Sequence, residues 1–428
     1  MSNLNVVLAK NTDKVSKGIC DFSQTVAFSH YNHLSAQLPL DSKTNELVSG
    51  GIKEQAIQSF KNLEEIITSI NHVMNDVIRI TIFTKNIKDM EAVEEVYKTI
   101  FKTHLPTLTE VIVKDIPLNA LVQIEAVITC GEGTIPNAPQ AGDIVQVVTN
   151  TENAPKCELS SQSIAFSHYN NITTQLPIDP KTGKIVGTTA KEQLKQSLTN
   201  VKNVLLNIDV PFDDIVKVTI YTKDLKETVA IKEMYKTFFP DSAIARAVDY
   251  LPALSIVEVV DLAHGALVSV ETVISHGDGT PPQIVEDRHG IVIEANNSCK
   301  VYRCSHLSHS VAFSHYNNLS SQFPVDIDNK LVSGGIKEQT TQCLENMKNI
   351  LENVEHEMAD VVKLNIFVKN ISDVNTISEV LKTFFPALIP AGRIVEVANI
   401  QYDALVQIDA VVGNAEGTPP VSKQCCSK

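Results

Sequence analysis

A five-residue motif, Phe-Ser-His-Tyr-Asn, occurs three times in the chain and limits the possible folds more than any other feature. It begins at Phe28, Phe166 and Phe313, so that successive copies are 138 and 147 residues apart. This spacing is the size of a domain and is too long for a solenoid repeat. We therefore predict three copies of one module, at residues 1–138, 139–285 and 286–428.

The composition is that of an ordinary globular protein, with 43% apolar and 20% charged residues. No apolar run approaches the ~18 residues of a membrane helix, and the first residues lack the pattern of a secretory signal. We expect a cytoplasmic protein without membrane contacts. The net charge of −14 disfavours a nucleic-acid partner, because such binding relies on clustered basic residues. The role of Cys425-Cys426, in a polar tail, is left open.

Changes of hydrophobic period along the first copy predict its secondary structure. Alternation over 23–28 predicts a strand, and a turn near Ser29-His30 with a second strand through Leu38 completes a hairpin. Apolar residues spaced by three and four from Ile52 to Ile70 predict a long helix. A strand at 78–82, a helix at 89–101 and strands at 110–113 and 121–128 follow. The other copies predict second helices at 225–239 and 371–385 and final strands at 256–259, 267–274, 394–397 and 405–412.

This order, β-β-(β)-α-β-α-β-β, predicts an α+β module with both helices on one face of a single sheet. The uncovered face of such a sheet needs a partner. Three joined copies can pack these faces together around a shared axis, which makes one chain the equivalent of a symmetric trimer. The second copy carries extra residues at 241–250, between its second helix and its penultimate strand.

Each copy resembles the Rid (YjgF-type) family of small trimeric proteins, whose founding members are imine deaminases. The segment from Phe22-Ser23-Gln24 to Gln37-Leu38-Pro39 is similar to the family's Tyr-Ser-Gln … Ser-Gly-Gln-Ile-Pro. Residues 252–259, Pro-Ala-Leu-Ser-Ile-Val-Glu-Val, resemble its Pro-Ala-Arg-Ser-x-Val-Glu-Val. The resemblance implies a chorismate-mutase-like fold, a pseudo-trimer around a central β-barrel, and a pocket between each pair of neighbouring modules.

The resemblance also implies the chemistry of an active pocket. An arginine in the Pro-Ala-Arg motif clamps the carboxylate of a 2-imino acid, for which its planar pair of donors is suited. A glutamate on the last strand positions the hydrolytic water, and a tyrosine and a serine line the remainder.

This chain departs from that pattern at the arginine. The position is Leu108 in copy one, Leu254 in copy two and Gly392 in copy three, where Arg393 follows one place later. Arg393 reaches the pocket if the turn before it takes another path; otherwise it faces solvent beside Glu396, because a one-residue shift on a strand reverses the direction of the side chain. Loss of the clamp should weaken carboxylate binding about 10- to 100-fold.

The other pocket positions also differ. Gln and Ser cannot replace the Glu as a general base, so the first two sites should be unable to catalyse the family reaction. The expected pocket-lining residues, besides Leu108 and Leu254, are Gln123, Ser269 and Gln407 at the Glu position, Phe22, Ser160 and Leu307 at the Tyr position, and Ser35, Thr173 and Ser320 at the Ser position.

Three acids lie two residues beyond the altered Glu position, on the same strand face: Glu125, Glu271 and Asp409. These acids, as activators of water, and Arg393, as the carboxylate clamp of the third site, are the candidate catalytic residues. The alternative is that they are structural carboxylates held by hydrogen bonds.

Histidines recur in the motif itself as His30, His168 and His315, which suggests either a second repeated site or a structural role in the hairpins. Cys304, His306 and His309 have the chemistry of metal ligands, but they lack a fourth partner and the other copies do not repeat them. We expect no metal and no cofactor.

Three functions compete. The first is a diverged Rid protein that binds a small metabolite, such as a carboxylate, between its modules, with deamination lost or limited to one site near Arg393. The second is an active hydrolase of 2-aminoacrylate-type imines. The third is a structural or regulatory interaction protein whose pockets are filled by side chains. Further association of pseudo-trimers is left open.

Overall fold

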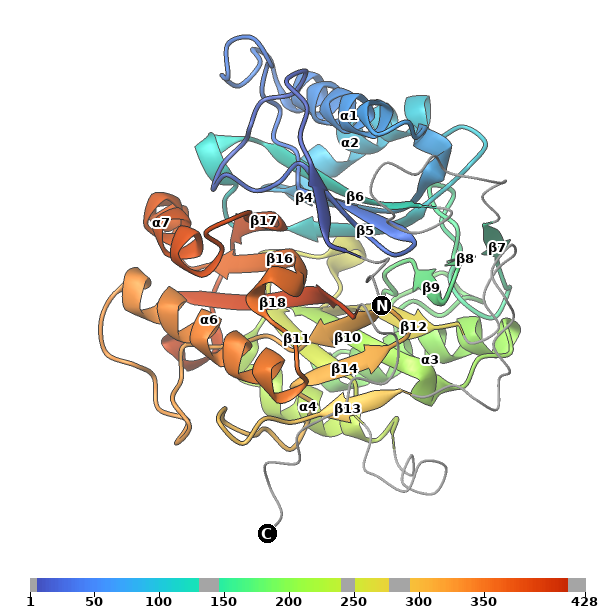
Figure 1. Cartoon of the computed structure of the whole chain (residues 1–428). Helices are drawn as coiled ribbons and strands as arrows, with labels where there is room; N and C mark the ends of the chain where they lie inside the picture. Colours follow the sequence, from blue (N-terminus) through green and yellow to red (C-terminus); the bar gives the residue numbers. More distant parts are fainter. Residues whose placement is uncertain (1–5, 131–145, 240–250, 277–292, 415–428) are drawn as a thin grey trace.

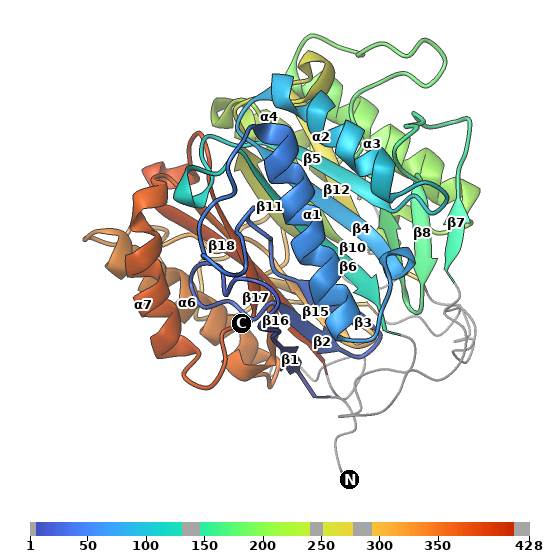
Figure 2. The same ribbon diagram turned by 90° about the horizontal axis from the view of Figure 1, so that it is seen from above.

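The computed structural model describes residues 6–130, 146–239, 251–276 and 293–414. The predicted module boundaries, the extra residues at 241–250 and Cys425-Cys426 lie outside these ranges. The described strands form three six-stranded sheets, one in each copy of the module. Figures 1 and 2 show the helices on the outside of the molecule and the three sheets towards its centre.

Module one has the strand order β1-β2-β3-β6-β4-β5, in which only β4 and β5 are parallel. The two helices α1 and α2 lie on one face of the sheet, which confirms the α+β prediction. The elements are β1 (Leu8–Lys10), β2 (Thr25–Phe28), β3 (Tyr31–Leu34), α1 (Ile52–Ser69), β4 (Val77–Thr84), α2 (Ile87–Ile100), β5 (Thr107–Ile112) and β6 (Val122–Thr129).

Modules two and three repeat this topology. The elements of module two are β7 (Val147–Thr149), β8 (Ser163–Phe166), β9 (Tyr169–Ile172), α3 (Ala190–Asn207), β10 (Ile215–Thr222), α4 (Thr228–Lys236), β11 (Ala253–Glu258) and β12 (Val268–Ser275). The elements of module three are β13 (Glu294–Asn296), β14 (Ser310–Phe313), β15 (Tyr316–Leu319), α6 (Ile336–Asn353), β16 (Val361–Val368), α7 (Val374–Phe384), β17 (Ala391–Glu396) and β18 (Val406–Gly413).

Two details of the sheets differ from the sequence-based prediction. The short edge strands β1, β7 and β13 were not predicted. The second hairpin strand ends at Leu34, because the backbone beyond it leaves the hairpin: the Ala36 N–H donates to the Gly392 carbonyl of module three, and Gln37 pairs with Ile124. The alternating pattern predicts that the second hairpin strand continues beyond Leu34, but the chain there bonds to a neighbouring module instead.

Each module has its own core between its helices and the sheet face beneath them. In module one this core contains Phe60, Leu63, Ile67 and Tyr97, all almost fully buried. The stripe from Ile52 to Ile70 therefore faces the sheet, as its periodicity predicts.

The other faces of the sheets pack against one another around a common axis. Two apolar clusters contain residues of all three modules, one around Phe28 and Tyr31 and the other around Phe83 and Tyr221. The contacts are cyclic: the hydroxyl of Tyr31 donates to the Phe166 carbonyl, that of Tyr169 to Phe313, and that of Tyr316 to Phe28. One chain thus forms the predicted pseudo-trimer.

A closed central barrel stays a prediction. Among the described residues, the three sheets have no continuous ladder between them. Isolated bridges link them instead, between Ile112 and Asp261 and between Asp115 and Glu396.

Candidate functional site

The same pair of hydrogen bonds, one to a side-chain hydroxyl and one between backbone groups, joins neighbouring modules at all three clefts. Each combines the predicted Ser position of one module with the predicted Arg position of another. Ser35 Oγ accepts a hydrogen bond from the Gly392 N–H (2.8 Å), Thr173 Oγ1 from Leu108 (3.0 Å) and Ser320 Oγ from Leu254 (2.8 Å). The N–H groups of Ala36, Thr174 and Ser321 donate back to the carbonyls of Gly392, Leu108 and Leu254.

The residues that the sequence analysis assigned to one pocket therefore lie next to each other, and in the structure the Ser and Thr hydroxyls link the modules. Each hydroxyl also donates to a carbonyl of its own module, namely that of Ser23, Ser161 or Ser308.

Two clefts are filled by leucine. Leu108 is 4% exposed and Leu254 2%, and both belong to the apolar cores of their modules. The neighbouring module adds a side chain to each core: Leu159 packs into the core of module one and Leu307 into that of module two. In copy two it is thus Leu159, one residue before the aligned Ser160, that fills the cleft.

The third cleft is filled by an aromatic ring. A Cβ atom built on Gly392 would lie 2.4 Å from the ring of Phe22, far inside van der Waals contact. Phe22 is buried in the core of module three, although it belongs to module one. Any side chain at position 392, arginine included, would need this space. No described cleft therefore holds a cation at the expected anchor position.

The residues at the Glu position lie at the same clefts and are all buried. Gln407 Nε2 donates to Ser321 Oγ (2.7 Å) and to the Ile256 carbonyl (3.2 Å), which again links two modules. Gln123 Oε1 and Ser269 Oγ have no hydrogen-bond partner.

A small cavity remains between modules one and three. Phe22, Ser35, Gln123 and Gly392 are among its lining residues, and its volume is about 20 Å³. One water molecule needs roughly 10–15 Å³ on this measure, so the cavity is the size of a water molecule and not of an imino acid.

Arg393 lies in neither of the predicted places. Arg393 is 5% exposed, and its side chain points away from the cleft, because β17 pairs Gly392 with Leu364 and Arg393 with Asn365 on the opposite sheet face. The guanidinium Nη1 lies 2.6 Å from Oε1 of Glu125 in module one. The solvent-facing alternative beside Glu396 is therefore wrong, and so is the path into the pocket.

The guanidinium also lies over two aromatic rings, 4.9 Å from the centroid of Phe83 and 5.3 Å from that of Phe367. The two rings come from modules one and three. Arg393 is therefore held in the centre of the molecule by contacts to both modules.

The three predicted acids are part of a cyclic set of buried ion pairs. Each pairs with a basic residue of another module: Lys363 with Glu125 (2.9 Å), Arg79 with Glu271 (3.3 Å) and Lys217 with Asp409 (3.5 Å). The three cations occupy equivalent places on β4, β10 and β16. The sequence analysis missed them, although a basic residue recurs at this point of the middle strand in every copy.

Glu271 and Asp409 accept further hydrogen bonds from neighbouring side chains. Tyr221 donates to Glu271 (3.2 Å), while Ser255 and Asn365 donate to Asp409 (2.7 and 2.8 Å). Tyr221 and Ser255 are buried and Asn365 is partly buried, so protein side chains occupy these carboxylates, which supports the structural alternative for Glu125, Glu271 and Asp409.

Burial and the neighbouring charges shift the pKa values of Glu125 and Lys363 in this set of ion pairs. Burial disfavours the ionised form of Glu125, but Arg393 and Lys363 outweigh it and hold the pKa of this carboxyl below its usual value. Burial lowers the pKa of Lys363 to about 8, although Glu125 opposes the shift. A carboxylate with a lowered pKa and two cations against it is a weak base, so Glu125 is poorly suited to activate water.

The set Cys304, His306 and His309 does not form a metal site. His309 uses both ring nitrogens for the backbone: Nδ1 accepts from Ser298 N–H and Nε2 contacts the Tyr302 carbonyl (2.9 Å). Cys304 Sγ lies 4.0 Å from His306 Nδ1.

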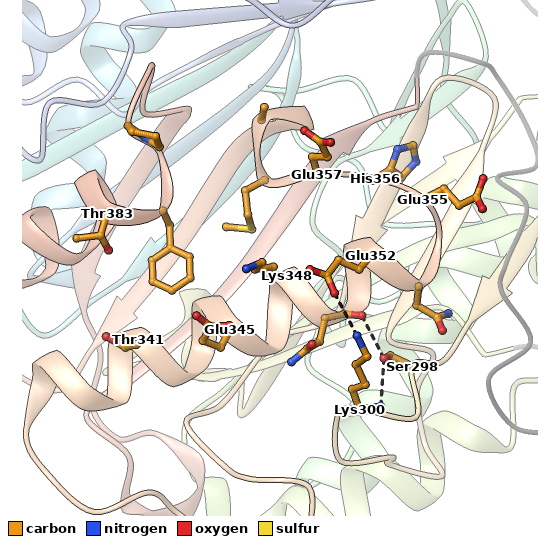
Figure 3. A pocket seen from close by; sticks show the side chains of 16 residues that line it. Ser298, Lys300, Thr341, Glu345, Lys348, Glu352, Glu355, His356, Glu357 and Thr383 are labelled. Carbon is orange, nitrogen blue, oxygen red and sulfur yellow. Dashed lines mark hydrogen bonds and ion pairs between the residues drawn. The ribbon is translucent and has the colours of Figure 1, made fainter.

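A wide groove of about 1,120 Å³ lies on the outer helical layer of module three, along α6 and the end of α7 (Figure 3). Its charged side chains are largely turned to solvent, and Lys300 pairs there with Glu352 at 3.2 Å. All of its lining residues belong to module three. The groove is therefore separate from the clefts between modules.

The fold and the clefts define a pseudo-trimeric α+β protein of the Rid type. Residues 14–130, 151–275 and 301–413 each match the family described as Endoribonuclease L-PSP, and the chain belongs to this family. This confirms the resemblance based on the sequence motifs.

Single modules match single-module relatives. A RutC family protein of Pyrococcus horikoshii is 33% identical over 116 residues, which is 27% of this chain and 92% of the relative. A 2-iminobutanoate/2-iminopropanoate deaminase of Dermatophagoides farinae is 32% identical (28% and 92%), and that of Mus musculus 34% (28% and 90%).

Among solved structures, the yjgF gene product of E. coli is 30% identical and covers 29% of this chain and 95% of its own, with a TM-score of 0.27. A Rid-family protein of Yersinia pestis is 32% identical, with coverages of 31% and 100% and a TM-score of 0.29.

Proposed function

We propose that this protein has lost imine deamination at all three clefts and serves as an interaction or structural protein. The observation that supports this most directly is the contact between Phe22 and Gly392, because an aromatic ring occupies the space that a carboxylate-binding arginine would need. Leu108 and Leu254 close the other two clefts with apolar side chains.

The relatives named as 2-iminobutanoate/2-iminopropanoate deaminases act on compounds that carry a carboxylate. A cleft for such a compound needs a cationic anchor and a group that activates water. Leu, Leu and Gly stand at the anchor position of this chain and Gln, Ser and Gln at the base position. The nearest carboxylates that could substitute are already paired with cations of neighbouring modules.

The test is release of ammonia from 2-aminoacrylate formed in situ, with the mouse deaminase as a positive control. We expect the rate with this protein to equal the rate in buffer. Acceleration in proportion to protein concentration would overturn the proposal. Because imines hydrolyse spontaneously, the comparison must be made at several protein concentrations.

Binding of a small metabolite is the second candidate, favoured by the cavity between modules one and three and by the unpartnered Gln123 Oε1 in its wall. Such a ligand must displace Phe22. A Phe22→Ala variant should therefore bind a short 2-oxo acid, measured by calorimetry, more tightly than the parent chain. Equal affinities would exclude this cleft as the site.

We also propose that the protein acts in the cytoplasm without nucleic acid or membrane as a partner. The net charge of −14 opposes binding to an RNA backbone, and no described helix has the length and apolarity needed to cross a membrane. RNA binding at physiological salt would contradict this proposal.

A further inference from the structure

Three imidazoles meet where the three modules come together. His30, His168 and His315 each occupy the two-residue turn of a hairpin, β2–β3, β8–β9 or β14–β15. Their ring centroids are 6.0, 6.0 and 6.1 Å apart, and one potential ligand atom from each lies within 4.8 Å of the others. Each module contributes one histidine, so the group exists only in the assembled ring.

The hairpin turns hold these histidines in a defined place. The preceding residues, Ser29, Ser167 and Ser314, have φ angles of +48°, +51° and +48°, a region that non-glycine residues rarely adopt. The surrounding structure keeps the turns in this conformation.

Hydrogen bonds fix the turns on both sides. The N–H groups of Cys130, His276 and Asn414 each donate at 2.7 Å to the carbonyl of the histidine in the same module. The tyrosine after each histidine bonds to the next module. The three imidazoles are therefore presented from fixed backbone positions, as metal ligands need to be.

The ring nitrogens of this group are not fully used by the protein. Nδ1 of His168 and Nδ1 of His315 are buried and have no hydrogen-bond partner. A purely packing role would be filled as well by an apolar ring, with no polar nitrogen left unsatisfied.

We propose that His30, His168 and His315 bind one divalent transition-metal ion, with Zn²⁺ as the best-suited ion, at the meeting point of the three modules. Zn²⁺ binds imidazole nitrogen at about 2.0–2.1 Å and accepts three histidines with a solvent molecule as fourth ligand. Binding therefore requires the imidazoles to rotate until the three nitrogens, now within 4.8 Å of one another, converge on the ion. His30 and His315 are only partly buried, which leaves the ion a route from solvent.

The ion would hold together three hairpins that the chain connects only through distant segments. It is a binding site separate from the clefts, and it does not depend on whether those clefts are active. This inference departs from the expectation of no metal, which came from Cys304, His306 and His309 and not from the repeated histidines.

Calorimetric titration of the full-length, EDTA-treated protein with ZnCl₂ tests the proposal. A Cys425→Ser/Cys426→Ser background removes the thiols of the tail. We expect one Zn²⁺ per chain, and at least a 100-fold loss of affinity in His168→Asn. His33→Asn is the matched control, because Asn171 and Asn318 already occupy that position in the other modules; its affinity should stay within about threefold of the parent.

A spectroscopic measurement on the unsubstituted chain covers the case in which a variant fails to fold. Co²⁺ should produce visible absorption bands of a four-coordinate site without the near-ultraviolet bands of thiolate ligands, and one equivalent of Zn²⁺ should abolish them. Absence of binding at 100 µM metal, a stoichiometry of three, or equal affinity in His168→Asn would each overturn the proposal.

Discussion

Arg393 of module three and Glu125 of module one form a buried ion pair with 2.6 Å between Nη1 and Oε1, although 268 residues separate them in the sequence. Lys363 contacts the other oxygen of the same carboxylate at 2.9 Å. The cyclic set of ion pairs between modules therefore contains the cations Arg79, Lys217, Lys363 and Arg393 around three acids. Arg393 is the one without an equivalent, since Thr109 and Ser255 take its place in the other copies.

This arrangement predicts unequal costs for the two partners. Glu125→Gln leaves two buried cations without their acid and should lower the free energy of unfolding by about 3–5 kcal/mol. Arg393→Ser leaves the Lys363–Glu125 pair intact and should cost about 1–2 kcal/mol, mainly through lost contacts with Phe83 and Phe367. Urea unfolding measures both. The opposite order would show that Lys363 does not compensate for Arg393.

Filling the third cleft further should destabilise the protein. Gly392→Ala places a methyl group 2.4 Å from the Phe22 ring, and overpacking of this kind costs about 1–3 kcal/mol. Phe22→Ala alone leaves a cavity and should cost about 3–5 kcal/mol. In the double variant the clash is absent, so the cost of Gly392→Ala should fall to near zero. A cost that persists would place the Phe22 ring elsewhere.

Glu110 on β5 predicts a pH-dependent stability. Burial, and next the charge of Glu94, raise its pKa to about 7, and its Oε1 has no hydrogen-bond partner. Between about pH 4.5 and pH 7 the folded state therefore holds more protons than the unfolded state, so stability falls as pH rises through this range.

The matching variant is Glu110→Gln, which should remove this slope and raise the free energy of unfolding at pH 7 by about 2–3 kcal/mol. Unfolding curves at several pH values measure it. Glu64→Gln, an exposed position on α1, is the control and should leave the slope unchanged. A slope that survives Glu110→Gln would assign it to another group.

Each of the three tyrosine hydrogen bonds between modules can be tested by itself. Tyr169→Phe removes the hydroxyl that donates to the Phe313 carbonyl and leaves a buried acceptor unpaired. The expected cost is about 1–2 kcal/mol, measured by urea unfolding. Tyr402 is 40% exposed, and Tyr402→Phe should change stability by less than about 0.5 kcal/mol. Equal effects would mean that the bond between modules contributes little.

Much of the fold follows from the sequence because it depends on local periodicity. The stripe from Ile52 to Ile70 and the alternation around Ile80 need no information from elsewhere in the chain. The edge strand Leu8–Lys10 escaped prediction because three residues are too few to show a period. The end of β3 escaped because Ala36 pairs with a different module.

The candidate site was predictable in part. Repeat alignment identified Ser35, Thr173 and Ser320 as equivalent positions, and each lies beside an aligned Arg position of another module because equivalent positions meet in a cyclic assembly. It could not locate Arg393, because the acid that attracts it comes from another module and only the register of β17 turns it inward. Leu159 replaced the aligned Ser160 through a local one-residue shift, which an ungapped comparison cannot detect.

The central claim is that all three clefts are closed to the substrates of the deaminase relatives. The most direct measurement is ammonia release from 2-aminoacrylate by the full chain, alongside its Phe22→Ala and Arg393→Ser variants and an active deaminase. The account predicts that the full chain and both variants match the buffer rate while the deaminase accelerates the reaction. Turnover by the full chain that saturates with substrate and disappears in Arg393→Ser would contradict it.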